Sequence, residues 1–389
     1  MLCAALSSGT VYSADFFWLG QTNASWGNAN WASNATGTPS LLNPGALDNV
    51  IFAATAAANQ AASTLPGNLT INSLTVNSAT GIGGAAFSEL TLTNGGSINS
   101  ALTLTNNITL LSSNALTIAA AGSLNVSASA DFFTNGTVSV NGALTNAGEM
   151  GGNGTFTMAN NVSLINNGFL AVESLLPGAS ALTLNTSGTG AVVMGAGSSL
   201  ALDLFTNAGD NTAIATAADR VNLNGTLDMT AGGEILLENS GVPPFLAAGD
   251  KWKLFNLGAG AQITGTAVVN DTMIMLLPTK VGSFTKADGV YTIRETNVAA
   301  FSVAAGETIT INRLLSVVDN AAETFTNAGT VVVRDGFLNI SNTGTGFTNR
   351  GTLAILAPGG GGFCYKSCSY KLGQPDQRRR SNVDQRQSA

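Results

Sequence analysis

Side chains that can transfer a proton are few and widely separated in this sequence. It has no histidine, which excludes Ser-His-Asp and Cys-His catalysis and every histidine-ligated metal site. Asp203 and Asp210 are the nearest pair of acids before Arg220, and because no Lys or Arg precedes Arg220, we expect no cation to accompany them. Polysaccharide lyases and hydrolases need clustered carboxylates, with basic groups for lyase chemistry. Because the acids are scattered singly, we expect no catalytic residues and no enzyme activity.

Short acidic turns are the remaining candidates for a metal site. Segments 207–211 and 319–323 offer oxygen ligands of the kind that calcium takes, but such turns are more often simply solvated. Segment 148–156 is similar to calcium-binding nonapeptides in its glycines but lacks the required Asp. The spacing of Cys364 and Cys368 is weak evidence for a metal, and the glycines form no phosphate-binding loop. We therefore expect no metal and no cofactor.

Charge is distributed unevenly along the chain. Residues 363–389 carry six Lys or Arg against two Asp, whereas the remainder has a net charge of −11. An acidic surface repels phosphate backbones, so we expect no nucleic-acid partner for the body. Residues 363–389 are expected to form a disordered basic tail. Their abrupt change of composition is typical of a frameshifted or truncated end, and a nucleic-acid or membrane-surface patch is the alternative.

The elements that would position any site are indicated by a repeat. Phe325-Thr-Asn-Ala-Gly-Thr returns at Phe347-Thr-Asn-Arg-Gly-Thr, each time before an apolar run. The repeated positions are Phe325, Asn327, Gly329, Phe347, Asn349 and Gly351. Asn146 and Asn166 form a further pair at nearly the same interval. A single Asn-Gly is typical of a hairpin turn, but recurrence at this interval favours stacked coils.

Short apolar–polar–apolar triads fill the intervals between these turns. They alternate with period two, as half-buried strands do, and are too short for a sandwich or a membrane barrel. The pattern predicts an all-β chain, a right-handed parallel β-helix with short turns, little helix and outward Thr, Ser and Asn. The residues expected inside include Leu102, Leu104, Ile108, Leu110, Leu116 and Ile118.

Trp18, Trp26 and Trp31 lie where the first coil needs a cover. We interpret them as a cap; a sugar-stacking platform is the alternative. The expected organisation is a truncated signal peptide at 1–14, a Trp-rich cap at 15–61, β-solenoid blocks at 62–282 and 283–362, and the tail at 363–389. An antiparallel excursion is expected within 218–266. No run approaches the ~18 consecutive apolar residues of a membrane helix, so we expect no membrane-spanning segment.

Several segments of the chain resemble the autotransporter-associated β-strand repeat proteins of bacteria. These are the Trp-rich opening, the "DNVIF" that follows it, the "ADRVNLNGTLDM" and "GDKWKLFN" segments and the "FTNAGTVVV" unit. The resemblance covers most of 15–362 and implies export, via the outer membrane, to the medium or the cell surface. It also implies a structural or adhesive role, with surface polysaccharides or other cell-surface components as partners. The alternative is a polysaccharide-active β-helix enzyme that uses surface carboxylates.

Overall fold

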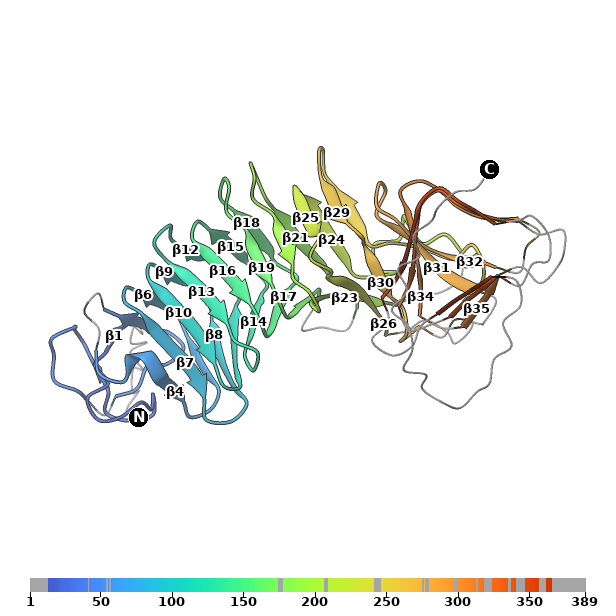
Figure 1. The fold of residues 1–389 in the computed structure, drawn as a ribbon. Coiled ribbons are helices and arrows are strands. Elements are labelled where there is room, and N and C mark those ends of the chain that lie inside the picture. The colour runs from blue at the N-terminus through green and yellow to red at the C-terminus, as the bar shows by residue number, and fades with distance from the viewer. Residues whose placement is uncertain are drawn as a thin grey trace, which may run out of the picture.

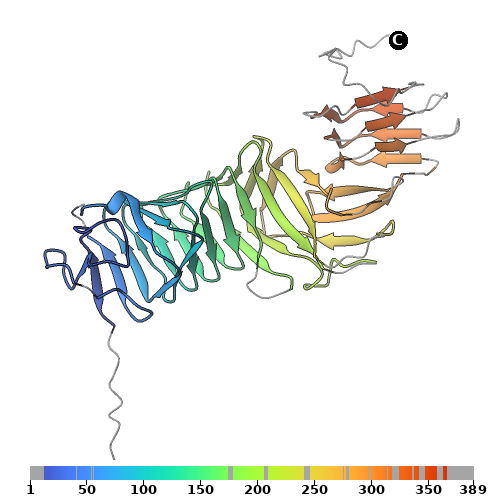
Figure 2. The same ribbon diagram turned by 90° about the horizontal axis from the view of Figure 1, so that it is seen from below.

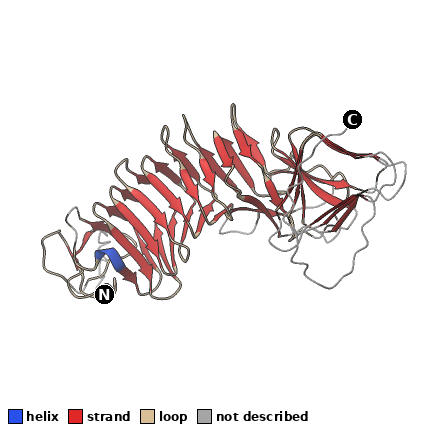
Figure 3. Cartoon of the chain, in the orientation of Figure 1, coloured by secondary structure: helices blue, strands red, loops and turns tan. Residues whose placement is uncertain are grey.

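The computed structural model is an elongated rod built almost entirely of short β-strands (Figure 1; Figure 3). The structure describes residues 13–40, 42–53, 55, 57–173, 178–205, 209–240, 246–274, 276, 280–296, 298, 300–312, 314–317, 324–334, 337–340, 347–356 and 362–365. The helical element among them is one 3-10 turn, η1 (Gln60–Ala62). None of the described helices is of a length and hydropathy that would let it cross a membrane. The expectation of an all-β chain with little helix is confirmed.

Three sheets, of eleven, nine and nine strands, run side by side along most of the rod, and all their pairs are parallel except β1 with β2. The first sheet contains β2 (Trp31–Ala32), β1 (Asp15–Trp18), β3 (Asn49–Phe52), β6 (Ser73–Val76), β9 (Gly96–Ile98), β12 (Leu116–Ile118), β15 (Thr137–Val140), β18 (Thr155–Met158), β21 (Ala181–Asn185), β24 (Arg220–Asn224) and β28 (Phe255–Leu257). The second contains β4 (Ser63–Leu65), β7 (Thr80–Gly84), β10 (Ala101–Thr105), β13 (Ser123–Val126), β16 (Ala143–Asn146), β19 (Leu164–Asn166), β22 (Val192–Met194), β25 (Thr226–Met229) and β29 (Gln262–Gly265). The third contains β5 (Leu69–Ile71), β8 (Ser88–Leu92), β11 (Ile108–Ser112), β14 (Asp131–Thr134), β17 (Glu149–Gly152), β20 (Phe169–Ala171), β23 (Ser199–Leu204), β26 (Glu234–Asn239) and β30 (Val268–Asn270).

Each coil of this long stack (β3–β26 and β28–β30) gives one strand to each sheet. Leu102 pairs with Leu124, Thr109 with Asp131 and Leu116 with Val138, so one coil is 22 residues long here. Strands so close in sequence can pair in parallel only if the chain completes a full turn between them, which is the geometry of a β-helix.

The alternating triads place their apolar residues on the rod axis. The residues expected inside are all 0% exposed: Leu102, Leu104, Ile108, Leu110, Leu116 and Ile118. The Thr between Leu102 and Leu104 points outward and is half-buried by neighbours in the adjacent coils. The sequence prediction of a parallel β-helix is therefore confirmed, with one continuous core from Trp18 to Ile293.

An antiparallel hairpin interrupts the coils after β30. β31 (Lys280–Thr285) and β32 (Val290–Glu295) pair with each other, and β32 also pairs with β27 (Lys251–Lys253). The excursion expected within 218–266 is wrong in extent: among the strands described in this range β27 is the antiparallel one, and β24, β25, β26, β28 and β29 all belong to parallel coils. The second block expected to begin at 283 therefore begins with this hairpin.

Coils resume in a second, short stack (β33–β41), which Figure 2 shows displaced to one side of the long stack. Its strands are β33 (Ala300–Val303), β34 (Glu307–Ile311), β35 (Leu314–Val317), β36 (Thr324–Asn327), β37 (Thr330–Val333), β38 (Phe337–Ile340), β39 (Phe347–Asn349), β40 (Thr352–Ile355) and β41 (Gly362–Tyr365). β41 pairs in parallel with β38. The tail expected from 363 is thus wrong at its start, because residues 363–365 belong to this strand. Residues 366–389, and residues 1–12 of the expected signal peptide, lie outside the described residues.

Candidate functional site

The repeated phenylalanines form a ladder inside the short stack. Phe325 pairs with Phe347 on the next coil, and their rings stack with centroids 5.6 Å apart. Phe301 on the preceding coil continues the ladder at 5.7 Å from Phe325. The predicted stacking is confirmed, but Phe301 was missed, because its coil has Val303 where the repeat has Asn.

The repeated asparagines form a second ladder. Asn327 donates from Nδ2 to Asn349 Oδ1 at 2.8 Å and to the Thr352 carbonyl at 2.9 Å, and its Oδ1 accepts from Gly329 N at 3.1 Å. Expected to stack at a turn, Asn327 is the last residue of β36, directly before the bend at 328–329, and is 1% exposed. A side chain at Gly329 or Gly351 would meet a carbonyl of the preceding coil at 2.0–2.2 Å, which explains why Gly follows Asn at the same spacing in both coils.

The same arrangement occurs in the long stack. Asn146 donates to Asn166 Oδ1 and to the Phe169 carbonyl, each at 2.7 Å, and both asparagines are buried. These repeat residues satisfy buried backbone groups and face away from solvent. Their chemistry is therefore structural.

The three tryptophans close the N-terminal end of the long stack. Trp18, Trp26 and Trp31 are 0–1% exposed and pack edge-on or tilted against one another and against Phe52, with ring centroids 4.9–6.4 Å apart. Trp31 Nε1 donates to the Trp26 carbonyl at 2.9 Å. Rings so buried have no free face for stacking on a sugar, so the geometry suits the cap and not the platform.

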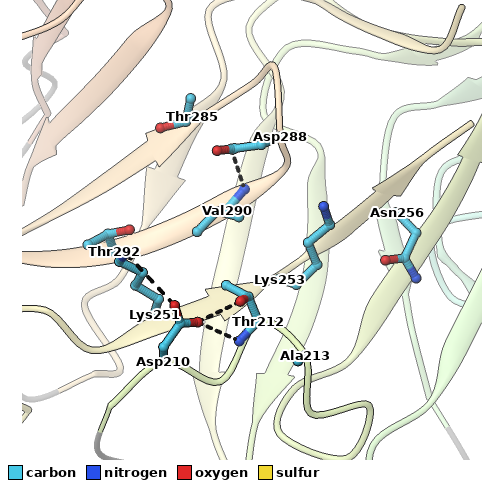
Figure 4. Close-up of a pocket in the computed structure, with 10 residues that line it drawn as sticks. All are labelled: Asp210, Thr212, Ala213, Lys251, Lys253, Asn256, Thr285, Asp288, Val290 and Thr292. Atoms are coloured by element: carbon cyan, nitrogen blue, oxygen red, sulfur yellow. Dashed lines mark hydrogen bonds and ion pairs between the residues drawn. The ribbon is translucent and has the colours of Figure 1, made fainter.

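A polar groove of about 750 Å³ lies where the long stack meets the hairpin (Figure 4). We call it the junction groove; it is lined by Asp210, Thr212, Ala213, Lys251, Lys253, Asn256, Thr285, Asp288, Val290 and Thr292. Its walls come from the β23–β24 connection, from β27 and β28, and from the two strands and the turn of the hairpin. Segments far apart in the sequence therefore share one surface.

Charged groups converge in the junction groove. Lys251 Nζ lies 4.0 Å from Asp210 Oδ2, so the expectation that no cation accompanies Asp210 is wrong. Hydrogen bonds from the Thr212 hydroxyl and backbone N–H, and then the Lys251 charge, hold the pKa of Asp210 below its usual value. Asp288 accepts from Val290 N at 3.1 Å. Among the described lysines, Lys253 alone has neither an ion pair nor a hydrogen bond, and its ammonium projects away from the Asp210–Lys251 pair.

A second set of carboxylates, the acidic row, follows the outer face of the third sheet. It consists of Asp131, Glu149, Glu173, Asp203 and Glu238. Asp131 pairs with Glu149 and Asp203 with Glu238 on neighbouring coils, so the acids are not scattered singly as expected. Burial first, and then the charges of Glu173, Asp131 and Glu238, raise the pKa of Glu149 to about 7. The sequence signal was the coil spacing, which places equivalent positions of successive coils side by side.

Asp203 and Asp210, the pair noted in the sequence, belong to different places. Asp203 is in the acidic row, and Asp210 is in the junction groove. Nearby Asp219 is 2% exposed and accepts from Ser180 N at 2.7 Å and from Asp203 N at 3.1 Å. Burial raises the pKa of Asp219 to about 7, and its backbone contacts give it a structural role in closing the β23–β24 connection.

Metal ligands do not gather in the part of the chain that the structure describes, where no three His, Cys, Asp or Glu residues could hold an ion together. Segment 319–323 lies outside the described residues, as do Cys3 and Cys368. Of segment 207–211, only Gly209, Asp210 and Asn211 are described.

No protein family, no curated protein and no solved structure matches the chain. Its function must therefore be argued from the arrangement itself. Asp210 is held ionised by hydrogen bonds, so it is a poor proton donor at neutral pH. The junction groove combines two lysines and two aspartates with hydroxyl and amide groups, and this lining suits recognition of a polar, charged ligand.

Proposed function

We propose that this protein is an exported or cell-surface β-helical scaffold with a structural or adhesive role, which binds through its long surface without catalysis. One observation carries the proposal: the same outward face recurs on successive coils. Asn99 donates to Asn77 at 2.8 Å, Asn224 to Asn185 at 2.8 Å and Asn256 to Asn222 at 2.8 Å, all on the outside of the first sheet.

A repeated face creates affinity through many weak contacts. Successive coils offer Thr, Ser or Asn side chains at equivalent outward positions, such as Thr75, Ser97 and Thr117, at ~4.8 Å intervals. A polymer or a surface can therefore engage several coils at once. Surface polysaccharides or other cell-surface components are the expected partners. Net negative charge on the body argues against nucleic acid.

Removing whole coils tests this proposal. Deletion of residues 101–122 removes one coil and joins strands that already share a register, because Ala101 pairs with Ser123. Deletion of 101–142 removes two, since Ser123 pairs with Ala143. In the otherwise full-length protein, we expect binding to a bacterial surface to weaken with each deleted coil. Asp203→Ala should leave this binding nearly intact. Binding that does not change after two coils are lost would contradict the scaffold.

A polysaccharide-active enzyme is the second candidate, favoured by the four charged side chains in the junction groove and by the pKa of Glu149 at about 7. The full chain would be incubated with acidic and neutral polysaccharides, and reducing ends and unsaturated products measured. Product release that disappears with Asp210→Ala or with Glu149→Gln would establish catalysis and overturn the non-catalytic proposal.

Localisation has its own test. We expect the protein, expressed in its native bacterium, to be accessible to an impermeant amine-reactive label on intact cells or to be recovered from the medium. Recovery only after lysis would contradict export.

A further inference from the structure

Positive side chains are absent from the first 219 residues, and after Arg220 the next two, Lys251 and Lys253, are at the junction groove. Positions 1–219 contain nine Asp or Glu and no Lys or Arg. Lys251 and Lys253 are the first lysines of the chain, and both line the groove. An anionic ligand therefore meets acidic side chains without cations along most of the long stack, and it meets the first lysines of the chain at the groove.

The two lysines are held on one face by the strand between them. Lys251 and Lys253 alternate with Trp252, which is 0% exposed and packs against Tyr291 with ring centroids 6.3 Å apart. Backbone pairing of β27 with β32 fixes the strand, so both lysine side chains leave it toward the groove. Since Asp210 pairs with Lys251 and nothing described pairs with Lys253, one positive charge in the groove is left for a ligand.

The remaining lining suits hydroxyl groups. Asn256, Thr285 and Asp288 line the groove around Lys253, and Thr292 lies beside Lys251, its pairing partner across β27 and β32 (Figure 4). Carboxylates accept hydrogen bonds from sugar hydroxyls but repel closely spaced phosphates. The lining therefore matches a ligand with one isolated negative charge among several hydroxyls.

We propose that the junction groove binds a sugar acid within an anionic polysaccharide, with the sugar carboxylate on Lys253 and its hydroxyls on Asp288, Asn256 and the two threonines. This inference rests on the adhesive role proposed above and gives it a charge-selective site. The long stack supplies many weak contacts, and the groove selects the polymer.

Calorimetry with the full chain and a galacturonic acid hexasaccharide tests the site. The methyl ester of the same hexasaccharide keeps the hydroxyls and lacks the charge, so it is the matched neutral probe. We expect the acid to bind more tightly than the ester. Lys253→Gln should weaken acid binding by about tenfold, as loss of a charged hydrogen bond does, and Lys253→Glu should abolish acid binding. Asp210→Asn should tighten acid binding, because it releases Lys251.

Arg350→Gln is the control for net charge, since Arg350 is an exposed residue of the short stack. It should leave the affinity unchanged, and circular dichroism should confirm that each variant is folded. Equal binding of acid and ester, no binding of the acid, or an affinity that Lys253→Gln leaves unchanged would each overturn the inference. Deletion of coil 101–122, far from the groove, should leave hexasaccharide affinity intact; loss of surface adhesion in that variant alone concerns the scaffold and not the groove.

Discussion

The long stack and the short stack are built from the same coil but are stabilised to different extents. Strands in the long stack belong to sheets of nine and eleven, whereas two of the three sheets in the short stack have three strands each. The described buried cluster of the short stack contains nine hydrophobic residues, one of them Val281 of the hairpin. The long stack has an aromatic cap at its first coil, and the short stack starts on the hairpin.

The contacts between the two stacks are largely polar. Asn312 donates to the Val269 carbonyl at 3.1 Å and to Asp271 Oδ1 at 2.9 Å, and Arg334 pairs with Glu234 at 2.8 Å. In a stacked-coil protein, stability is roughly a sum of coil and interface contributions. A short stack of few coils, joined through polar bonds, is therefore expected to unfold separately from the long one.

The largest effect should come from removing one buried phenylalanine from each stack. Phe325 belongs to the ladder of the short stack, and Phe156 of the long stack is 0% exposed and packs edge-on against Phe132 with ring centroids 6.0 Å apart. Phe325→Ala and Phe156→Ala each leave a buried cavity, at a cost of about 3–5 kcal/mol. All four tryptophans lie in the core of the long stack, so their fluorescence reports its unfolding, while circular dichroism reports both stacks. We expect Phe325→Ala to move only the dichroism transition and Phe156→Ala to move the fluorescence transition. Equal movement of both transitions by Phe325→Ala would mean that the stacks unfold as one unit.

Buried asparagines offer a comparison at matched chemistry. Asn146→Ala and Asn327→Ala each leave carbonyl and amide partners unpaired, and each should lower the free energy of unfolding of its own stack by about 1–3 kcal/mol. Denaturant titration followed by the same two signals measures this. Asn125→Ala, on the outer face of β13, is the control and should change stability by less than about 0.5 kcal/mol. A cost confined to one stack would show that the two ladders are not equivalent.

The acidic row should make the long stack sensitive to pH. Within this row, the folded-state pKa of Glu149 is about 7 and exceeds the usual 4.5. Glu149 therefore binds its proton more tightly in the folded than in the unfolded state. This contribution is fully present below pH 4.5 and is lost as the pH rises through 7. The fluorescence transition should therefore indicate greater stability at pH 5 than at pH 8, on the order of 1 kcal/mol after solvent screening. Glu149→Gln should reduce this slope, the remainder coming from Asp219, whose pKa burial also raises to about 7, and Glu89→Gln should leave the slope as it is. An unchanged slope in Glu149→Gln would exclude Glu149 as a source.

The smallest effect concerns the coupling of the stacks. Arg334→Gln removes a partly exposed ion pair across the interface and should cost about 0.5–1 kcal/mol. The short stack should bear most of this cost, so that the separation between the dichroism and fluorescence midpoints widens slightly. Arg350→Gln, which removes the same charge without that pair, should leave the separation unchanged.

The coil architecture could be predicted because it depends on a local sequence pattern and its repeat spacing. Alternation of Leu and Thr specifies which face is buried, and the return of the Phe325 motif at Phe347 specifies the stacking partner. The acidic row was predictable in principle from the same register, since Asp131 and Glu149 occupy equivalent positions, but the acids were considered in sequence order alone.

The junction groove could not be predicted in this way. Asp210 lies in an irregular connection, Lys253 on β27, which pairs antiparallel with β32, and Asp288 in a hairpin turn. Their proximity depends on where the hairpin packs, which no repeat specifies. The charged groove is therefore formed by segments that depart from the coil pattern, whereas the core is formed by the repeats.

The absence of basic residues from most of the long stack also bears on how the protein resists peptidases. Peptidases that cleave after Lys or Arg find no bond to cut before Arg220, even in an unfolded chain. Arg220 opens β24, which is paired with β21 on one side and β28 on the other. Its guanidinium donates to the Thr212 and Ile214 carbonyls. A trypsin-like enzyme that needs an extended, unpaired segment would have to break the stack before reaching this bond. Digestion should therefore begin beyond the long stack and leave the long stack intact.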